Sequence, residues 1–154
     1  MALNIREIAT QLATLTVSGV TICDMGSIPS SDQITRSPQM FPEPINFLSD
    51  LSINRDSFGD PSAARKTATY TLTYTFVYSE AGLGRDLNDK YPGMVSLAAD
   101  ILDAIIGFDD MNQLIDPVVE IVPSIPGAFG VVYEPGGKAC LGAIIQLRVT
   151  EFIN

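Results

Sequence analysis

Apolar residues recur at helical spacing near the start of the chain. In residues 4–16 they follow one another at steps of three and four, which places them on one face of a helix. These positions are Ile5, Ile8, Leu12 and Leu15. Asn4 stands at the N-cap position, and Glu7 occupies the matching capping-box position three residues later. The sequence therefore predicts an amphipathic helix over residues 4–16, followed by a short strand over residues 20–23.

Residues 68–78 carry the strongest alternation in the chain. Aromatic and apolar side chains occupy the even positions and threonines most of the odd ones, the two-residue period of a strand with two unlike faces. The even positions are Tyr70, Leu72, Tyr74, Phe76 and Tyr78, and the odd ones are Thr69, Thr71, Thr73, Thr75 and Val77. A strand this long would pair with other chains if it lay exposed at an edge. We therefore expect it either at the centre of a sheet or covered by a neighbouring subunit.

A second helical pattern covers residues 93–107. Its apolar stripe consists of Met94, Leu97, Ala98, Ile101, Leu102, Ile105 and Ile106. Asp100 and Asp103 fall outside this stripe and are expected to face water, and Gly107 marks the predicted end. We expect the helix to pack on the aromatic face of the 68–78 strand.

The last third of the chain is rich in β-forming residues. Runs at residues 117–122, 130–133 and 139–152 predict strands, and the Pro-Gly-Gly turn within residues 134–137 predicts a hairpin between the last two. In the second arm of this hairpin, one face carries Leu141, Ala143, Ile145, Leu147 and Val149. Gln146, Arg148 and Thr150 fall on the other face.

These elements predict a single α+β domain over residues 1–154. Its sheet, antiparallel or mixed, has a long central strand at about 68–78 and a C-terminal hairpin, flanked by helices at about 4–16 and 93–107. The residues expected in the core include Tyr74, Phe76, Leu97, Ile101, Leu102, Ile145 and Leu147.

Residues 24–66 break this regularity, because serine, proline, aspartate and glycine recur there and only residues 45–53 look structured. A loop of more than forty residues without structure or function is uncommon in a compact domain. The segment is therefore either disordered or used on a partner. Its apolar side chains favour use on a partner, because a purely solvated loop gains nothing from them. The candidate contact residues are Met40, Phe41, Phe47 and Leu48.

Composition limits the chemistry of a chain of 154 residues, which has room for one domain with a core. The absence of histidine excludes Ser-His-Asp and Cys-His catalysis and zinc sites built on imidazole. The net charge of −9 argues against a phosphate-gripping nucleic-acid surface and a polybasic membrane anchor. Eleven of the eighteen acidic residues follow residue 79, against four basic ones, so this part of the chain is expected to present either a solvated acidic surface or one that repels DNA.

The apparent ligand motifs fail on their chemistry. Lys138 follows two glycines, but Ala139 stands where a P-loop needs the hydroxyl that holds magnesium. Asp109, Asp110 and Asp116 carry the hard oxygen ligands that a divalent cation prefers, but they lack the spacing of a calcium loop. We therefore predict no catalytic, cofactor or metal site.

Cys23 and Cys140 lie in apolar runs without CxxC spacing, so they are either buried reduced thiols or one disulfide. The N-terminal residues are interrupted by charge where a signal peptide needs an apolar core, and no apolar run approaches the length of a membrane span. An intracellular protein is expected.

The order of elements resembles that of the tail terminator proteins of long-tailed bacteriophages. The resemblance is carried by residues 5–15, 69–78, 94–106 and 133–152. It implies a hexameric ring without enzymatic activity, located in the virion after assembly in the host cytoplasm. The expected partners are further copies of the chain, the tail tube protein and a head-closure or connector protein. DNA would pass through the ring without specific binding.

The anionic composition suits a channel that passes DNA, and long loops would extend a head-to-tail contact between subunits. Other phage neck or tail-completion proteins, including head-closure and connector proteins, remain open. So do two other classes: a small intracellular binding module, and an enzyme that uses carboxylates and a divalent ion.

Overall fold

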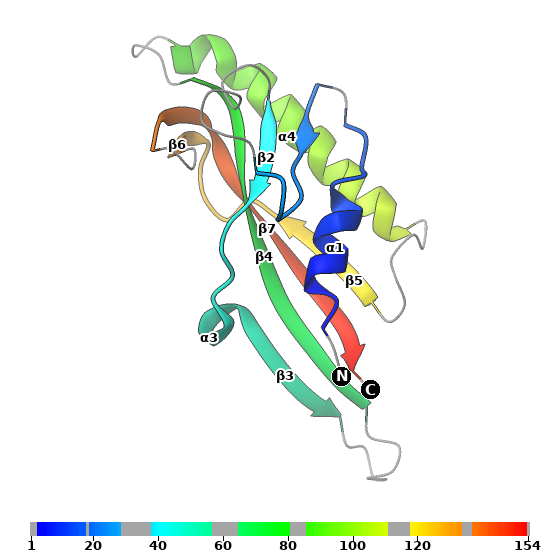
Figure 1. Ribbon diagram of the computed structural model, residues 1–154. Coiled ribbons are helices and arrows are strands. Elements are labelled where there is room, and N and C mark those ends of the chain that lie inside the picture. The colour runs from blue at the N-terminus through cyan, green and yellow to red at the C-terminus, as the bar shows by residue number, and fades with distance from the viewer. Residues whose placement is uncertain are drawn as a thin grey trace.

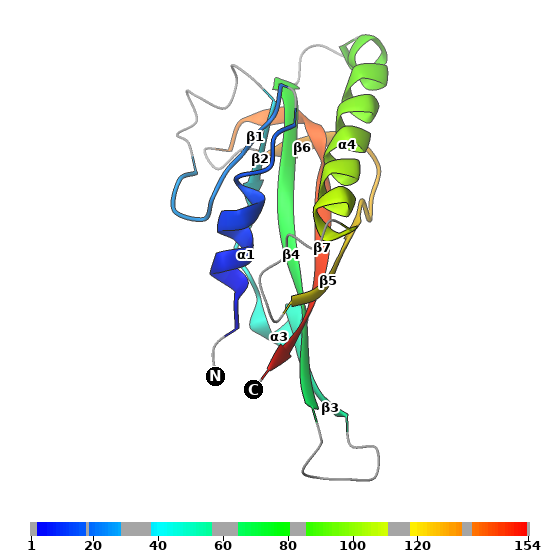
Figure 2. The same cartoon turned by 90° about the vertical axis from the view of Figure 1, so that its right-hand side faces the viewer.

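The computed structural model describes residues 3–17, 19–28, 38–56, 65–80, 86–110, 118–133 and 137–153. The protein is an α+β fold in which a seven-stranded mixed sheet carries its two longer helices on one face. The elements in chain order are α1 (Ile5–Leu12), β1 (Thr21–Ile22), β2 (Gln39–Pro42), α3 (Phe47–Asp50), β3 (Leu51–Asp56), β4 (Arg65–Glu80), α4 (Asp86–Asp110), β5 (Val118–Ser124), β6 (Gly130–Tyr133) and β7 (Ala139–Ile153). Figures 1 and 2 show α1 and α4 side by side on the same face of the sheet.

The sheet is built around two long antiparallel strands, β4 and β7. They pair over nearly their whole length, from Lys66 opposite Ile153 to Glu80 opposite Cys140, with one irregularity between Val77 and Ser79. The predicted strand at 68–78 is confirmed and is longer than expected, with 16 residues. It lies at the centre of the chain's own sheet, where its backbone groups are paired on both sides.

Short strands flank the two long ones. On the outer side of β4, β2 pairs with its second half and β3 with its first half. On the outer side of β7, β5 and β6 pair with different parts of the strand. All of these pairs are antiparallel, and only β1, beyond β2, runs parallel to its neighbour among the described strands. The predicted hairpin is β6–β7, with Tyr133 opposite Ala139.

The segment 24–66 is more structured than the sequence predicts. Besides α3 and β3, it contains β2, in which Met40 lies opposite Phe76 and Phe41 opposite Thr75. The prediction that only residues 45–53 are structured was therefore wrong, because these apolar side chains find partners within their own chain. Residues 29–37 and 57–64 of the segment lie outside the described part.

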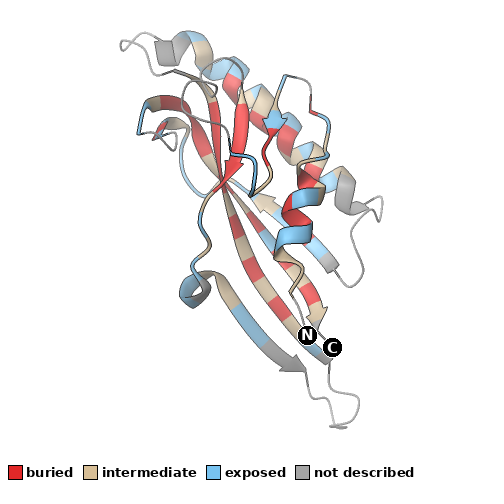
Figure 3. Cartoon of the chain, in the orientation of Figure 1, coloured by how far each residue is buried: buried red, intermediate tan, exposed pale blue. Residues whose placement is uncertain are grey.

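The core lies between the sheet and the helices. Five of the residues expected there are fully buried, and Leu97 and Leu102 are partly buried and pack against them. The five are Tyr74, Phe76, Ile101, Ile145 and Leu147. Figure 3 shows the resulting alternation of buried and less buried residues along β4 and β7. Met94, Ala98 and Ile105 of α4 join this core, whereas Asp100 and Asp103 face water as predicted.

The helix boundaries differ from the prediction. α1 ends at Leu12, four residues early, and the Asn4 side chain makes no capping bond because it faces the carboxylate of Glu151. α4 begins at Asp86, before the predicted start, and takes in Pro92. Proline has no amide hydrogen, so one backbone hydrogen bond is missing at Pro92, in the second turn of this 25-residue helix.

Candidate docking groove

The second face of the sheet is covered by neither α1 nor α4. Side chains alternate between faces along a strand, so the odd positions of β4 point away from the helices. A small apolar cluster forms on this second face, and Ile144 packs against it. Its members are Cys23, Phe41, Val77, Val132 and Cys140.

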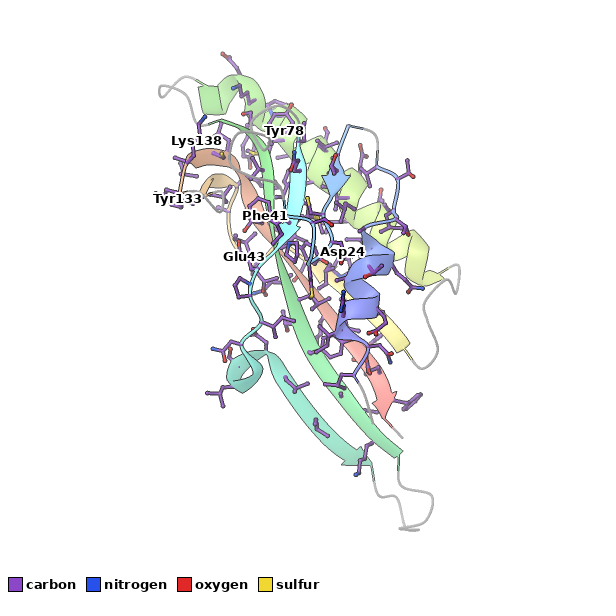
Figure 4. All side chains as sticks on the ribbon, viewed as in Figure 1. Asp24, Phe41, Glu43, Tyr78, Tyr133 and Lys138 are labelled. Atoms are coloured by element: carbon purple, nitrogen blue, oxygen red, sulfur yellow. The ribbon has the colours of Figure 1, made fainter. Side chains whose placement is uncertain are left out.

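Beside this cluster the surface is hollowed into a groove of about 700 Å³. Its walls are formed by Ile28, by residues 41–44 after and within β2, and by residues 131–133 of β6. Thr75 and Ile144, which lie opposite each other on β4 and β7, also line it. The groove therefore crosses four strands at one end of the sheet, and Figure 4 shows Phe41, Glu43 and Tyr133 at this end.

The lining is mainly apolar and partly open to water. Tyr133 is 63% exposed, Val131 57% and Ile28 41%, which are high values for side chains of this kind. Phe41, by contrast, is buried and forms part of the floor cluster. Exposed apolar side chains gathered around a hollow are typical of a site that another molecule covers.

One acidic side chain, Glu43, stands among the described residues that line the groove. It is held in place twice, because its amide donates to the Thr73 carbonyl at 2.8 Å and its Oε1 accepts from the Thr75 hydroxyl at 2.5 Å. The prolines on either side restrict the backbone further, since each fixes its own φ angle. The groove therefore offers one rigidly placed negative charge within an apolar surface.

A second hollow of about 280 Å³ adjoins the first. It shares Ile28 and residues 42–44 with the groove and extends it toward Met25 and Ile45. Because they share these residues, the two hollows form one continuous apolar depression beside β2.

The four candidate contact residues do not form one surface. Met40 is buried on the helix side, and Phe41 is buried at the groove. Both side chains therefore have partners within their own chain, and their assignment as partner contacts stays a prediction. Leu48 on α3 is 97% exposed but lies outside the groove lining, and the Phe47 side chain lies outside the described part of the chain.

Sequence reasoning missed most of the groove. Ile28 stands alone in a polar stretch, and Ile144 lies on the face of β7 that was expected to be polar. The one signal available was the β6 run, where Val131 and Tyr133 alternate with Val132 and therefore cannot share a buried face with it. Because both faces of β6 are apolar, we expect each face to be covered, either by the chain itself or by another molecule.

Glu151 and Tyr70 form a buried polar pair on the helix side of the sheet. Glu151, fully buried at the end of β7, accepts a 2.7 Å bond from the Tyr70 hydroxyl and 3.2 Å bonds from the Asn4 amide. Burial raises the pKa of Tyr70 above its ordinary value, and the bond to Glu151 and its negative charge raise it further. This cluster ties the start of α1 to the end of the sheet and has the character of a structural anchor.

Tyr74 is equally buried, but no described residue provides a hydrogen-bond partner for its hydroxyl. Burial raises the pKa of Tyr74, with smaller contributions from Asp24 and then Cys23. Burial also raises the pKa of the Cys23 thiol. All three groups stay neutral near pH 7, so none of them supplies an activated nucleophile there.

Both cysteines are buried, and neither forms a disulfide. The Cys23 amide bonds to the Met40 carbonyl beside β2, and Cys140 lies on β7 with β4 between them. Three strand spacings of about 4.8 Å separate them, about twice the reach of a disulfide. The disulfide alternative is therefore excluded.

The described residues hold no cluster of three or more cysteines, aspartates and glutamates that could bind a metal ion. Asp116 and the side chains of Asp109 and Asp110, the candidate metal ligands, lie outside the described part. Of the described helices, none has the length and apolarity needed to cross a membrane. Neither a family model nor a curated protein matches the chain.

Proposed function

We propose that this chain is a structural protein of a phage virion, a tail terminator that forms a ring at the top of the tail and joins it to the head or neck. The proposed partners are further copies of the chain, in six-membered rings, the tail tube protein and a head-closure or connector protein. The ring would assemble in the host cytoplasm and remain in the virion. Its role is mechanical, and no catalytic step is assigned to it.

One observation carries the proposal: a single copy leaves two unlike apolar surfaces uncovered. The groove exposes Ile28, Val131 and Tyr133, and a separate region around α3 exposes Leu48. Two different surfaces on one chain suit a head-to-tail contact, which generates a ring when the rotation closes. A contact between the two surfaces in neighbouring copies would cover both of them.

The charge distribution supports the same role. Asp89, Asp100 and Asp103 are exposed on α4, on the face of the sheet opposite to the groove. These carboxylates would repel the phosphates of passing DNA. A ring that carried them toward its channel would let DNA through without holding it.

The alternative is another phage neck or tail-completion protein, such as a head-closure or connector protein, because the same ring-forming surfaces would serve there. A small intracellular binding module, for which the groove alone would suffice, is a second alternative. Electron microscopy of the purified protein with preformed tail tubes separates the three. We expect rings seated at one end of each tube, and no further elongation when tube protein is added. Rings that do not bind tubes but bind the portal protein would favour the connector role. Monomers that form no rings would favour the binding module.

A further inference from the structure

We propose that the ring closes by insertion of one copy's β3 arm, residues 47–56, into the groove of the next copy. The inference rests on the proposed ring and names the contact that would hold it together. Its occupant is therefore a second copy of this chain.

The β3 arm presents two apolar side chains to water. Leu48 on α3 is 97% exposed, so it gains almost nothing from its own chain, and Ile53 on β3 is 52% exposed. Two hydrogen bonds hold the backbone around Leu48 in place. Asn46 Oδ1 accepts from the Leu48 amide at 3.0 Å, and Asp50 Oδ2 accepts from the Asn46 amide at 2.9 Å. An apolar side chain held outward in this way is typical of an anchor for another surface.

The arm is also placed to reach a neighbour. β3 pairs with the first half of β4, whereas the groove is lined by Thr75 in the second half, so the two surfaces occupy different ends of the sheet. Figure 1 shows β3 extending past the end of the layer formed by α1 and α4. An arm beyond the body of its own molecule can contact a second copy without a clash between the two bodies.

The groove is the matching surface on the chain. It has room for several side chains, is lined mainly by apolar groups, and is bordered by the exposed Val131 and Tyr133 of β6. In the described part of the chain, β6 pairs only with β7 and β3 only with β4. Both strands therefore have an edge with which a strand of another copy can pair.

Charge favours this pairing over other contacts between two copies. Each copy carries a net charge of −9, so most approaches bring negative surfaces together. At its far end the arm carries Arg55, which lies opposite Lys66, and Asp56, which lies opposite Arg65, so three of these four residues are basic. Lys66 is exposed, and the groove holds the fixed carboxylate of Glu43. A contact that brings this basic end near Glu43 is complementary in charge as well as in polarity.

Two variants test the contact from opposite sides. Leu48→Asp changes the arm and Tyr133→Glu changes the groove, and both side chains are exposed enough for the monomer to fold unchanged. Each variant should weaken the association between copies by on the order of ten- to a hundredfold and give monomers where the wild type forms rings. Mixed together, the two variants should form a dimer and nothing larger, because one intact arm meets one intact groove. Ile106→Asp on α4, at a side chain 45% exposed, is the matched control and should leave the ring intact.

Sedimentation velocity on the wild type, the three variants and the mixture decides between the outcomes. A ring that survives Leu48→Asp, a mixture that stays monomeric, or a ring lost in Ile106→Asp would overturn the arm-in-groove contact while the proposed ring stands. A wild type that is monomeric at every concentration would instead overturn the proposed function.

Discussion

Tyr70 and Tyr74 lie four residues apart on β4 and point to the same face of the sheet, but their hydroxyl groups have different surroundings. Tyr70 donates to the buried carboxylate of Glu151 at 2.7 Å, whereas no described residue accepts from Tyr74. A hydrogen bond to a charged group contributes about 1.5–3 kcal/mol, and an unpartnered buried hydroxyl contributes nothing in return for its desolvation. The two residues therefore form a matched pair for testing the buried polar groups.

Replacement of each tyrosine by phenylalanine should give opposite results. Tyr70→Phe should lower the free energy of unfolding by about 1.5–3 kcal/mol, because it leaves the Glu151 carboxylate without one of its donors. Tyr74→Phe should change it by less than about 0.5 kcal/mol or raise it, because only an unpartnered hydroxyl is removed. Urea denaturation of both variants measures the difference, and equal losses would contradict the assigned surroundings.

The raised pKa values of Tyr70 and Tyr74 predict a loss of stability at alkaline pH. In the unfolded chain both phenols ionise near pH 10, whereas in the folded state they keep their protons. Their contribution to stability is therefore complete below pH 10 and decreases above it, by about 1.4 kcal/mol per pH unit for each tyrosine. Urea denaturation between pH 9 and about 11 should show this slope. Tyr74→Phe should remove its own share, and an unchanged slope would contradict its burial.

Gly142 of β7 lies close against the backbone of β4. A β-carbon there would overlap the Phe76 carbonyl oxygen, so Gly142→Ala must push the two strands apart. We expect a loss of at least about 2 kcal/mol in the free energy of unfolding. Gly107→Ala in α4 is the control, because its β-carbon meets nothing within 4 Å and should raise stability by about 0.5–1 kcal/mol. Thermal denaturation that shows similar effects for both would contradict the strand packing.

At the scale of elements, periodicity alone predicted the parts of the fold with long, regular patterns. The strand at 68–78, the helix at 93–107 and the β6–β7 hairpin each combine a clear period with a long run or a turn. β2 was missed because it has only four residues, ends in Pro42 and pairs with a strand more than thirty residues away. The groove could not be predicted for the same reason, because its lining comes from short segments that only the sheet topology brings together.

The cap predicted at the start of α1 is absent for a related reason. The sequence assigned Asn4 to a cap, which is a local interaction, but the Asn4 amide and side chain instead donate to Glu151, 147 positions away. No local pattern can predict a partner at such a separation. α1 is therefore fixed by a contact with the end of β7 and by Ile8 and Leu12 in the core.

This anchoring predicts how α1 responds to a change at Glu151. Glu151→Gln keeps the size of the side chain but removes the charge that the Asn4 amide and the Tyr70 hydroxyl contact. Hydrogen exchange of the α1 amides should become faster by at least about tenfold, as expected for a loss near 1.5 kcal/mol. Glu120→Gln, at an exposed residue of β5, should leave this exchange unchanged. Equal rates in the Glu151 variant and the wild type would show that the core contacts alone hold the helix.

At the scale of the whole molecule, the protein has one face closed by helices and one face left open. The closed face holds the main core, and the open face carries the groove and the threonine side of β4. The exposed Leu48 and the groove together give one copy two unlike apolar surfaces. Stable interfaces between subunits bury more than about 1,000 Å² in total, which sets the area that a contact between the β3 arm and the groove must reach.

We propose that these two surfaces join copies of the chain into a closed ring. Native mass spectrometry of the wild-type protein at micromolar concentration tests it most directly, because it counts the copies in each particle. A closed ring predicts one discrete oligomer of six copies, with neither a ladder of open chains nor a dominant monomer. A protein that remains monomeric as its concentration is raised would contradict it.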